Sequence, residues 1–347
     1  MAVEILSGPV TGPYWADDGD IIVVSDDAVV SSDVNFESAI LTRSKSDDGL
    51  TVIVDGKVVG SDPGYGLKIS GNATDELGNP AGFNLIHVRE GGVVSGDLAI
   101  LLEGGQHNSI TVSGRVDGGH SGIWSDGDYL SVNVSGIVTG KYNAVAPNGD
   151  FGAFFISGRL VSPGVGIYSL DTYGTVISNT GKIKGGNGGV GGTNNENLTV
   201  HNHGVIAGTG DSSIGISLFE SDGFHLENDG RITGTIAISL DDSTATITNP
   251  GKMIGDSVGL SLGRIGLYSD RTVTVLNTGL IKGDTSLSAV SGLVHVTNMG
   301  VMNGHIDMDD QAQTELINGG KIIGTVKLGA LDDIYRAIDD GFVARMF

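Results

Sequence analysis

The chain has 347 residues, 58 of them glycine and none cysteine, and its 41 acidic residues against 19 basic ones give a net charge of −22. The lack of cysteine excludes a disulfide framework and a thiolate metal site, and the acidity argues against nucleic acid as a partner. Hydrophobic residues make up 39% of the chain, which is enough for a continuous core, so the glycine content does not indicate disorder.

Residues 1–50 are predicted to form an N-terminal cap with one irregular coil. The segment contains Trp15 and several aspartates, among them Asp17 and Asp26, and it alternates weakly around Val24 and Val29. A stack of repeats needs a polar end of this kind to remain soluble.

Residues 51–330 contain a glycine pair, Gly-x-x-x-Gly, that returns about every 22 residues. Eleven of the twelve pairs are complete, and only Gly158 is followed four residues later by another residue, Ser162. The first glycines of the pairs are Gly56, Gly92, Gly114, Gly136, Gly158, Gly181, Gly204, Gly230, Gly251, Gly279, Gly300 and Gly320. The interval of 36 residues between Gly56 and Gly92 predicts an insertion at 61–83, a place where a rigid scaffold often carries a binding loop.

The residues around each pair alternate between apolar and polar, which predicts short β-strands. One repeat is too short to close a core, so each must bury its apolar face against the next, with equivalent strands paired in parallel. Glycine is expected at corners that require a positive φ or leave no room for a Cβ. The sequence therefore predicts one all-β domain, a right-handed parallel β-helix of about 12 coils of roughly 22 residues.

An asparagine stands two residues before the first glycine in every coil from Asn179 onward. The seven positions are Asn179, Asn202, Asn228, Asn249, Asn277, Asn298 and Asn318. Amides repeated at one corner can donate and accept hydrogen bonds from coil to coil. We therefore predict a structural asparagine ladder inside the turn.

Seven of the twelve coils carry a basic residue directly after the first glycine, and two further lysines follow two places later on the same strand. The nine candidates for an outward face that binds an anionic polysaccharide are Lys57, Arg115, Arg159, Lys182, Lys184, Arg231, Lys252, Lys282 and Lys321. A row of cations at the coil spacing fits a polymer with regularly spaced carboxylates. The alternative interpretation is that long basic side chains only cover an exposed sheet and prevent its aggregation.

Acidic residues cluster near the end of each coil. The candidate ligands for Ca²⁺ are Asp241, Asp242, Asp309, Asp310, Asp332 and Asp333. Calcium takes roughly six to eight oxygen ligands, which aspartates can supply. The alternative is that these are solvated turn carboxylates, since no spacing matches an EF-hand loop. Ca²⁺ is the one cofactor that the sequence suggests.

Three stretches carry a family resemblance: Val-Ile-Ser-Asn-Thr-Gly-Lys-Ile-Lys-Gly (176–185), Val-Leu-Asn-Thr-Gly-Leu-Ile-Lys-Gly (275–283) and Ser-Ile-Gly-Ile-Ser-Leu (213–218). They resemble the repeat units of bacterial secreted β-helix proteins, among them autotransporter passengers and haemolysin-type (RTX) calcium-binding adhesins. The resemblance covers roughly residues 85–330 and implies an architecture more than an activity.

Residues 331–347 are predicted to be a C-terminal tail or the start of a further segment. Leu328 to Arg336 resembles the stretch that leads into the glycine-rich calcium nonapeptides of RTX proteins, although no complete nonapeptide follows. The N-terminus lacks the basic start and apolar run of a Sec signal peptide, and no stretch approaches the roughly 18 apolar residues of a membrane span. The resemblance implies an extracellular or cell-surface location, with type I secretion as a route.

The expected function is a non-enzymatic structural or adhesion module of a secreted bacterial protein, associated with Ca²⁺ and binding surface polysaccharide. The alternative is a polysaccharide lyase, hydrolase or epimerase that acts on an acidic glycan and needs a groove with converging carboxylates. No catalytic residue is predicted: His201 and His203 share one side of a strand, but two histidines alone make a poor zinc site. Aromatic residues are few, at 5%, so no sugar-stacking platform is expected.

Overall fold

The computed structural model describes residues 2–17, 19–33, 37–42, 49–71, 83–264, 271–338 and 341–346. These residues form a parallel β-solenoid of about 14 turns without a helix, which confirms the predicted all-β parallel β-helix and is compatible with its right-handed course and coil count. The chain divides into two compact units, Met1–Thr175 and Val176–Phe347, and each is described by itself.

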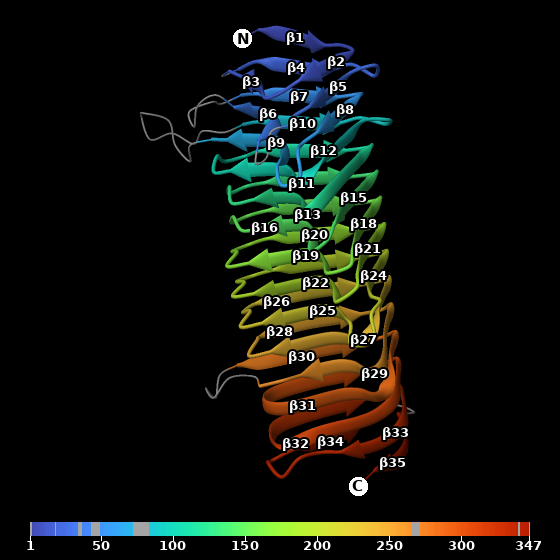
Figure 1. The fold of residues 1–347 in the computed structure, drawn as a ribbon. Coiled ribbons are helices and arrows are strands. Elements are labelled where there is room, and N and C mark those ends of the chain that lie inside the picture. The colour runs from blue at the N-terminus through green and yellow to red at the C-terminus, as the bar shows by residue number, and fades with distance from the viewer. Residues whose placement is uncertain are drawn as a thin grey trace, which may run out of the picture. The chain divides into compact units, whose positions relative to one another are not determined.

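In the first unit, each turn contributes strands to three columns of parallel strands, and Figure 1 shows β12 lying among them. The first column consists of β1 (Val3–Leu6), β4 (Ile21–Val24), β7 (Thr51–Val54), β10 (Leu85–Val88), β12 (Ser109–Val112), β14 (Ser131–Val134) and β17 (Ala153–Ile156). The second consists of β2 (Pro9–Thr11), β5 (Val29–Ser31), β8 (Lys57–Val59), the first parts of β11 (Val93–Glu103) and β13 (Arg115–Ser125), β15 (Ile137–Gly140) and β18 (Arg159–Ser162). The third consists of β3 (Tyr14–Ala16), β6 (Ser38–Thr42), β9 (Tyr65–Ser70), the later parts of β11 and β13, β16 (Asn143–Pro147) and β19 (Val165–Leu170).

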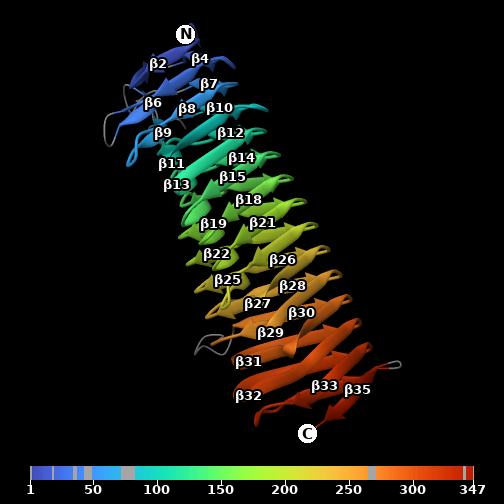
Figure 2. The ribbon, with the colours of Figure 1, turned by 45° about the vertical axis from the view of Figure 1, so that its right-hand side comes forward.

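The second unit has the same three columns, and Figure 2 shows β26, β28 and β30 one beneath the other. Its first column consists of β20 (Val176–Asn179), β23 (Thr199–Asn202), β26 (Phe224–Asn228), β28 (Ala245–Asn249), β30 (Thr272–Asn277), the last parts of β31 (Leu280–Asn298) and β32 (Val301–Asn318), and β34 (Ile334–Ala337). The second consists of β21 (Lys182–Gly185), β24 (Val205–Gly208), the first parts of β27 (Arg231–Asp241), β29 (Lys252–Leu262), β31, β32 and β33 (Lys321–Lys327), and β35 (Phe342–Met346). The third consists of β22 (Gly188–Thr193), β25 (Ile214–Phe219) and the later parts of β27, β29, β31, β32 and β33.

The predicted cap, insertion and tail each contain strands that belong to these columns. Residues 1–50, predicted to be a cap, contain β1 to β6, which pair in parallel with each other and with the next turn. The segment predicted as an insertion, 61–83, contains β9, which pairs with β6 and β11 and buries Leu67 completely; residues 72–82 lie outside the described residues. The predicted tail, 331–347, contains β34 and β35.

Along the strands, every second side chain points into the solenoid, and these inward side chains are mainly apolar. In β12, Ile110 and Val112 are fully buried, while Ser109 and Thr111 face outward. Fully burying an aliphatic side chain contributes about 1.5 to 3 kcal/mol. The core is therefore a stack of aliphatic layers that no single turn could provide.

The glycine repeat marks two corners of each turn, on either side of the second column. A Cβ on Gly136, a first glycine, would overlap the carbonyl oxygen of Gly114, and a Cβ on Gly140, a second glycine, would overlap that of Asn143. Neither residue has a positive φ. At Gly136 and Gly140 the requirement for glycine is therefore lack of space beside the neighbouring backbone.

The seven ladder asparagines of the second unit stand at the end of the first-column strands, two residues before the first glycine, and all seven side chains are completely buried. Each Nδ2 donates to the Oδ1 of the next asparagine, at 2.7 Å from Asn179 to Asn202 and 2.8 Å from Asn249 to Asn277. The chain of bonds continues to Asn318. The structure thus assembles these side chains into one continuous ladder.

Candidate ligand-binding surface

The basic residues that follow the first glycines lie at one register position of the second column. In the first unit the row runs from Lys57 through Val93 to Arg115, and from there through Ile137 to Arg159. Cations therefore occupy alternate strands, roughly 10 Å apart, because neighbouring strands lie about 4.8 Å apart. All three side chains are exposed.

In the second unit the corresponding residues are Lys182, Arg231, Lys252 and Lys321, which we call the basic row. Arg231 and Lys252 are direct register partners, so their strands are about 5 Å apart. Lys182 precedes Arg231 by two strands, and Lys321 follows Lys252 by three.

The two further candidates, Lys184 and Lys282, lie at the next outward position of the same column. Their shared register row runs through Ala207, Thr233 and Ile254, so the two lysines are four strands apart. Lys184 is half-buried and Lys282 is exposed.

Most of these cations are unpaired in the described part of the chain. Arg115 forms an ion pair with Asp117, and the Nζ of Lys321 lies 6.0 Å from the ring centroid of Phe342. Within the ranges that the structure describes, no carboxylate lies within 4.0 Å of the basic groups of Lys182, Arg231 and Lys252. These three exposed cations are therefore available to an anionic ligand.

A small polar pocket, which we call the corner pocket, adjoins the basic row. Its volume is about 180 Å³, and it is lined by Gly208, Thr209, Gly210, Ser213, Arg231, Thr233, Gly234, Ile254 and Asp256. Its wall is the corner between the second and third columns that follows β24. This corner has five residues, 209–213, whereas the same corner has two residues, 186–187, in the preceding turn and one, 235, in the following turn. The longer corner stands beside the outward residues of β27 and β29 and encloses the space.

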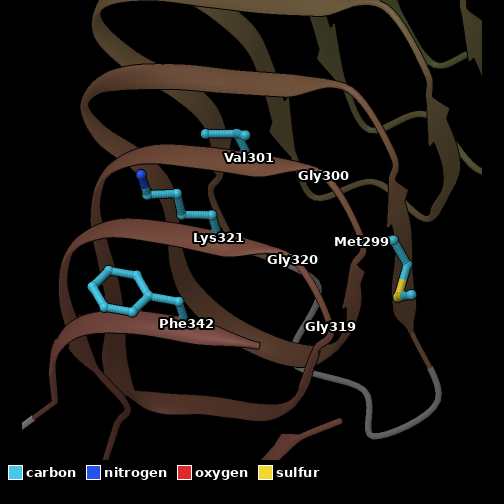
Figure 3. A pocket seen from close by; sticks show the side chains of 7 residues that line it. All are labelled: Met299, Gly300, Val301, Gly319, Gly320, Lys321 and Phe342. Carbon is cyan, nitrogen blue, oxygen red and sulfur yellow. The ribbon is translucent and has the colours of Figure 1, made fainter. Parts of the chain in front are cut away.

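A second hollow of about 530 Å³ lies at the end of the basic row (Figure 3). Val301, Lys321 and Phe342 project into it from three neighbouring strands, and Met299 lies across the corner. It is open and mainly apolar, and Lys321 is its one charged lining residue.

The candidate calcium ligands are not brought together. Asp242 binds the guanidinium of Arg271 at 2.8 Å, and Oδ1 of Asp241 accepts a hydrogen bond from the backbone of Arg264. Asp309, Asp310 and Asp332 are exposed. Asp333 is half-buried: its Oδ1 accepts the amide of Thr314 at 2.6 Å, and its Oδ2 is buried without a partner among the described residues. No group of three histidine, aspartate or glutamate side chains in the described ranges is placed to hold a metal ion.

The two histidines noted in the sequence join a larger polar group on the first column. Nδ1 of His201 lies 2.8 Å from Glu227, Nε2 of His225 lies 3.5 Å from the same carboxylate, and His203 pairs with Asp229. The hydrogen bond with His201, and then that with His225, lowers the pKa of Glu227. Both carboxylates of the group, Glu227 and Asp229, are exposed.

A stack of rings at the corner between the third and first columns of the first unit was not anticipated. Phe83, His107, Tyr129, Phe151 and Tyr173 follow one another with centroid distances of 4.6 to 5.3 Å, the first three contacts being nearly parallel. His107, Tyr129 and Phe151 have φ between 54° and 58°, which costs a bulky residue about 1 to 3 kcal/mol. The sequence signal was the spacing of Tyr129, Phe151 and Tyr173, which equals the coil repeat.

The fold and surface define a β-solenoid repeat protein with an outward row of cations. Comparison of the chain with protein-family models, with curated proteins and with solved structures found no match. The described residues contain no helix long and apolar enough to cross a membrane.

Proposed function

We propose that this chain is a non-enzymatic structural or adhesion module that binds an anionic polysaccharide along the basic row. The observation that carries the proposal is the set of exposed cations Lys182, Arg231 and Lys252, which have no ion pair among the described residues, in a chain whose acidic residues outnumber its basic ones by 41 to 19. Solubility does not require such a row, because the net charge is already −22.

The spacing of the row favours a polyanion over a single small anion. Two unit charges 4 to 5 Å apart repel by about 1 kcal/mol in water. A carboxylate placed beside Arg231 and Lys252 relieves this repulsion and gains attraction from both. Because the row continues over several strands, one chain molecule with repeated carboxylates can contact several cations at once, which strengthens binding without further contacts.

The proposed setting is the bacterial cell surface or the extracellular medium, with Ca²⁺ as an associated ion. Support for both comes from the repeat phrases at 176–185 and 275–283, which resemble those of secreted β-helix proteins. Titration of the purified chain with Ca²⁺ by calorimetry tests the ion: saturable heat supports the proposal, and the absence of any heat contradicts it.

The alternative, an enzyme acting on an acidic glycan, has less support. Hydrolysis of a glycosidic bond usually employs two carboxyl groups across one groove. The corner pocket contains one carboxylate, Asp256, and the hollow at Lys321 contains none. No observation on either hollow favours this second function.

The test is binding of the full chain to polygalacturonate and to the same polymer with its carboxylates reduced. We expect binding only to the acidic polymer, and weaker binding at high salt because exposed charges are screened. The triple variant Lys182→Ala, Arg231→Ala, Lys252→Ala should lose at least about tenfold in affinity, a modest loss for three contacts.

The matched control removes three lysines outside the row, Lys68→Ala, Lys141→Ala and Lys327→Ala, and so changes the net charge equally. It should bind within about twofold of the original chain, since long-range charge effects are screened at physiological salt. Equal losses in the two triple variants would show that net charge alone governs binding, and the basic row would not be the site.

A further inference from the structure

The corner pocket contains one cation and one anion that do not neutralise each other. Arg231 and Asp256 both line it, yet they form no ion pair within 4.0 Å among the described residues. Both residues are exposed to solvent. Opposite charges held apart in one small pocket favour a ligand that carries both a carboxylate and a hydrogen-bond donor.

The remaining polar groups of the pocket are hydroxyls and backbone. The lining includes three hydroxyl-bearing residues, Thr209, Ser213 and Thr233, and the backbone of Gly208, Gly210 and Gly234. Hydroxyls both donate and accept hydrogen bonds, which suits a ligand that is itself rich in hydroxyls. Ile254 supplies one apolar contact, as a sugar ring requires for its CH groups.

The long corner that forms the wall is held at both sides. On one side, the amide and the hydroxyl of Thr209 donate to the carbonyl of Gly185, at 2.9 and 3.2 Å, and Gly210 N donates to Gly186 O at 2.8 Å. On the other side, the hydroxyl of Thr235 donates to the carbonyl of Asp211 at 2.8 Å. The pocket is thus formed before any ligand arrives, which lowers the entropic cost of binding.

The size of the pocket limits its occupant. Pockets for drug-sized ligands have volumes of roughly 300 to 1,000 Å³, whereas this pocket has about 180 Å³. It therefore accommodates a single sugar residue and not an oligosaccharide. Because Arg231 belongs to the basic row, the residue in the pocket can be part of a polymer that continues along that row.

We propose that the corner pocket binds one uronic-acid residue of the polysaccharide, with its carboxylate on Arg231 and a ring hydroxyl on Asp256. This inference rests on the proposed function and adds a chemical class to it. It makes binding selective for acidic sugars over polyanions without hydroxyls, because a ring hydroxyl donates the hydrogen bond that the carboxylate of Asp256 accepts.

Asp256→Asn separates this inference from simple charge attraction, since the two predict opposite signs. Removing a negative charge beside the basic row strengthens binding of any polyanion. If Asp256 accepts a sugar hydroxyl, the same change replaces a charged acceptor with the weaker, neutral amide oxygen of asparagine and weakens binding of a uronate by up to about tenfold. The probes are a galacturonate oligomer and polyacrylate, a polyanion without hydroxyls.

The matched control is Asp284→Asn, which removes the same charge from the equivalent corner position of the next turn, directly after Gly283 rather than Gly255. A second pair is Thr233→Val, which removes a pocket hydroxyl, and Thr246→Val, which removes an exposed hydroxyl from another column. Both pocket variants should weaken galacturonate binding, and neither control should.

The inference is supported if Asp256→Asn weakens galacturonate binding and strengthens polyacrylate binding. It is overturned if the variant strengthens both or changes neither, or if the original chain binds polyacrylate but not galacturonate. The proposed function fails separately, if Arg231→Gln and Lys252→Gln leave the binding of both probes unchanged or the chain binds neither probe.

Discussion

Replacing Asn249 by alanine breaks the asparagine ladder in its interior. Its Nδ2 donates to Oδ1 of Asn277 at 2.8 Å and to the carbonyl of Leu280 at 3.2 Å, and its Oδ1 accepts from Nδ2 of Asn228 at 2.6 Å. The side chain is completely buried, so water cannot replace these partners without opening the corner.

The magnitude follows from which groups lose their partners. Oδ1 of Asn277 loses its ladder donor, and Nδ2 of Asn228 keeps only the carbonyl of Lys252 at 3.4 Å. A buried polar group left unsatisfied costs about 1 to 3 kcal/mol, and each intact hydrogen bond contributes about 1 kcal/mol. Asn249→Ala should therefore lower the free energy of unfolding by about 2 to 4 kcal/mol.

The matched variant is Asn179→Ala, at the start of the ladder. Oδ1 of Asn179 is buried without a hydrogen-bond partner among the described residues. This variant removes one donor to Asn202 but also removes an atom that is already unsatisfied. It should therefore cost about 1 to 3 kcal/mol less than Asn249→Ala.

Urea unfolding followed by circular dichroism measures both variants, and amide hydrogen exchange of peptides around residue 249 localises the effect. We expect faster exchange in the turns next to Asn249 and little change in distant turns, because a solenoid turn contacts mainly its neighbours. Equal losses in the two variants, or an unchanged midpoint for Asn249→Ala, would refute the role assigned to the ladder.

Two further predictions concern the aromatic stack and the histidine group. Tyr129→Ala should lower the melting temperature, because each ring contact contributes about 0.5 to 1.5 kcal/mol. Tyr129→Gly should lower it less, since the φ of 54° at this position suits glycine. A larger loss for glycine than for alanine would contradict the assigned backbone strain. Because hydrogen bonding with His201, and then with His225, lowers the pKa of Glu227 from its ordinary 4.5, the ionised carboxylate stabilises the fold above that pH, and this contribution is lost as the pH falls through the folded pKa. Glu227→Gln should therefore lower the melting temperature at about pH 5.5 and leave it unchanged at the acidic end of a plot of melting temperature against pH. A difference in melting temperature that is the same at every pH would contradict the ion pairs.

The repeat itself could be predicted from the sequence, because each turn imposes the same local constraint. Gly136 meets the same steric requirement as Gly114, and Asn249 has the same hydrogen-bonding role as Asn228, so the pattern is visible in a single sequence. The ring stack was harder to predict, since its members share no single residue type and His107 occupies a position of the repeat where Tyr or Phe stands in the following turns.

The corner pocket and the acidic corners depend on contacts that the sequence does not encode locally. Arg231 and Asp256 are 25 positions apart (256 − 231), and the space between them exists only because the corner at 209–213 is long. Arg271 reaches both Asp242 and Asp222, the latter 49 positions earlier. This contact engages Asp242, one of the candidate calcium ligands, in an ion pair.

The corner at 209–213 adds residues without shifting the turns on either side. Gly185 still pairs with Gly208 before the corner, and Gly188 still pairs with Ile214 after it. Loop length and strand register are therefore independent variables in this fold. New surface chemistry can be acquired one corner at a time, by insertion, while the buried layers and their ladders stay unchanged; a transplanted 209–213 segment should confer a pocket on any turn that carries a cation after its first glycine.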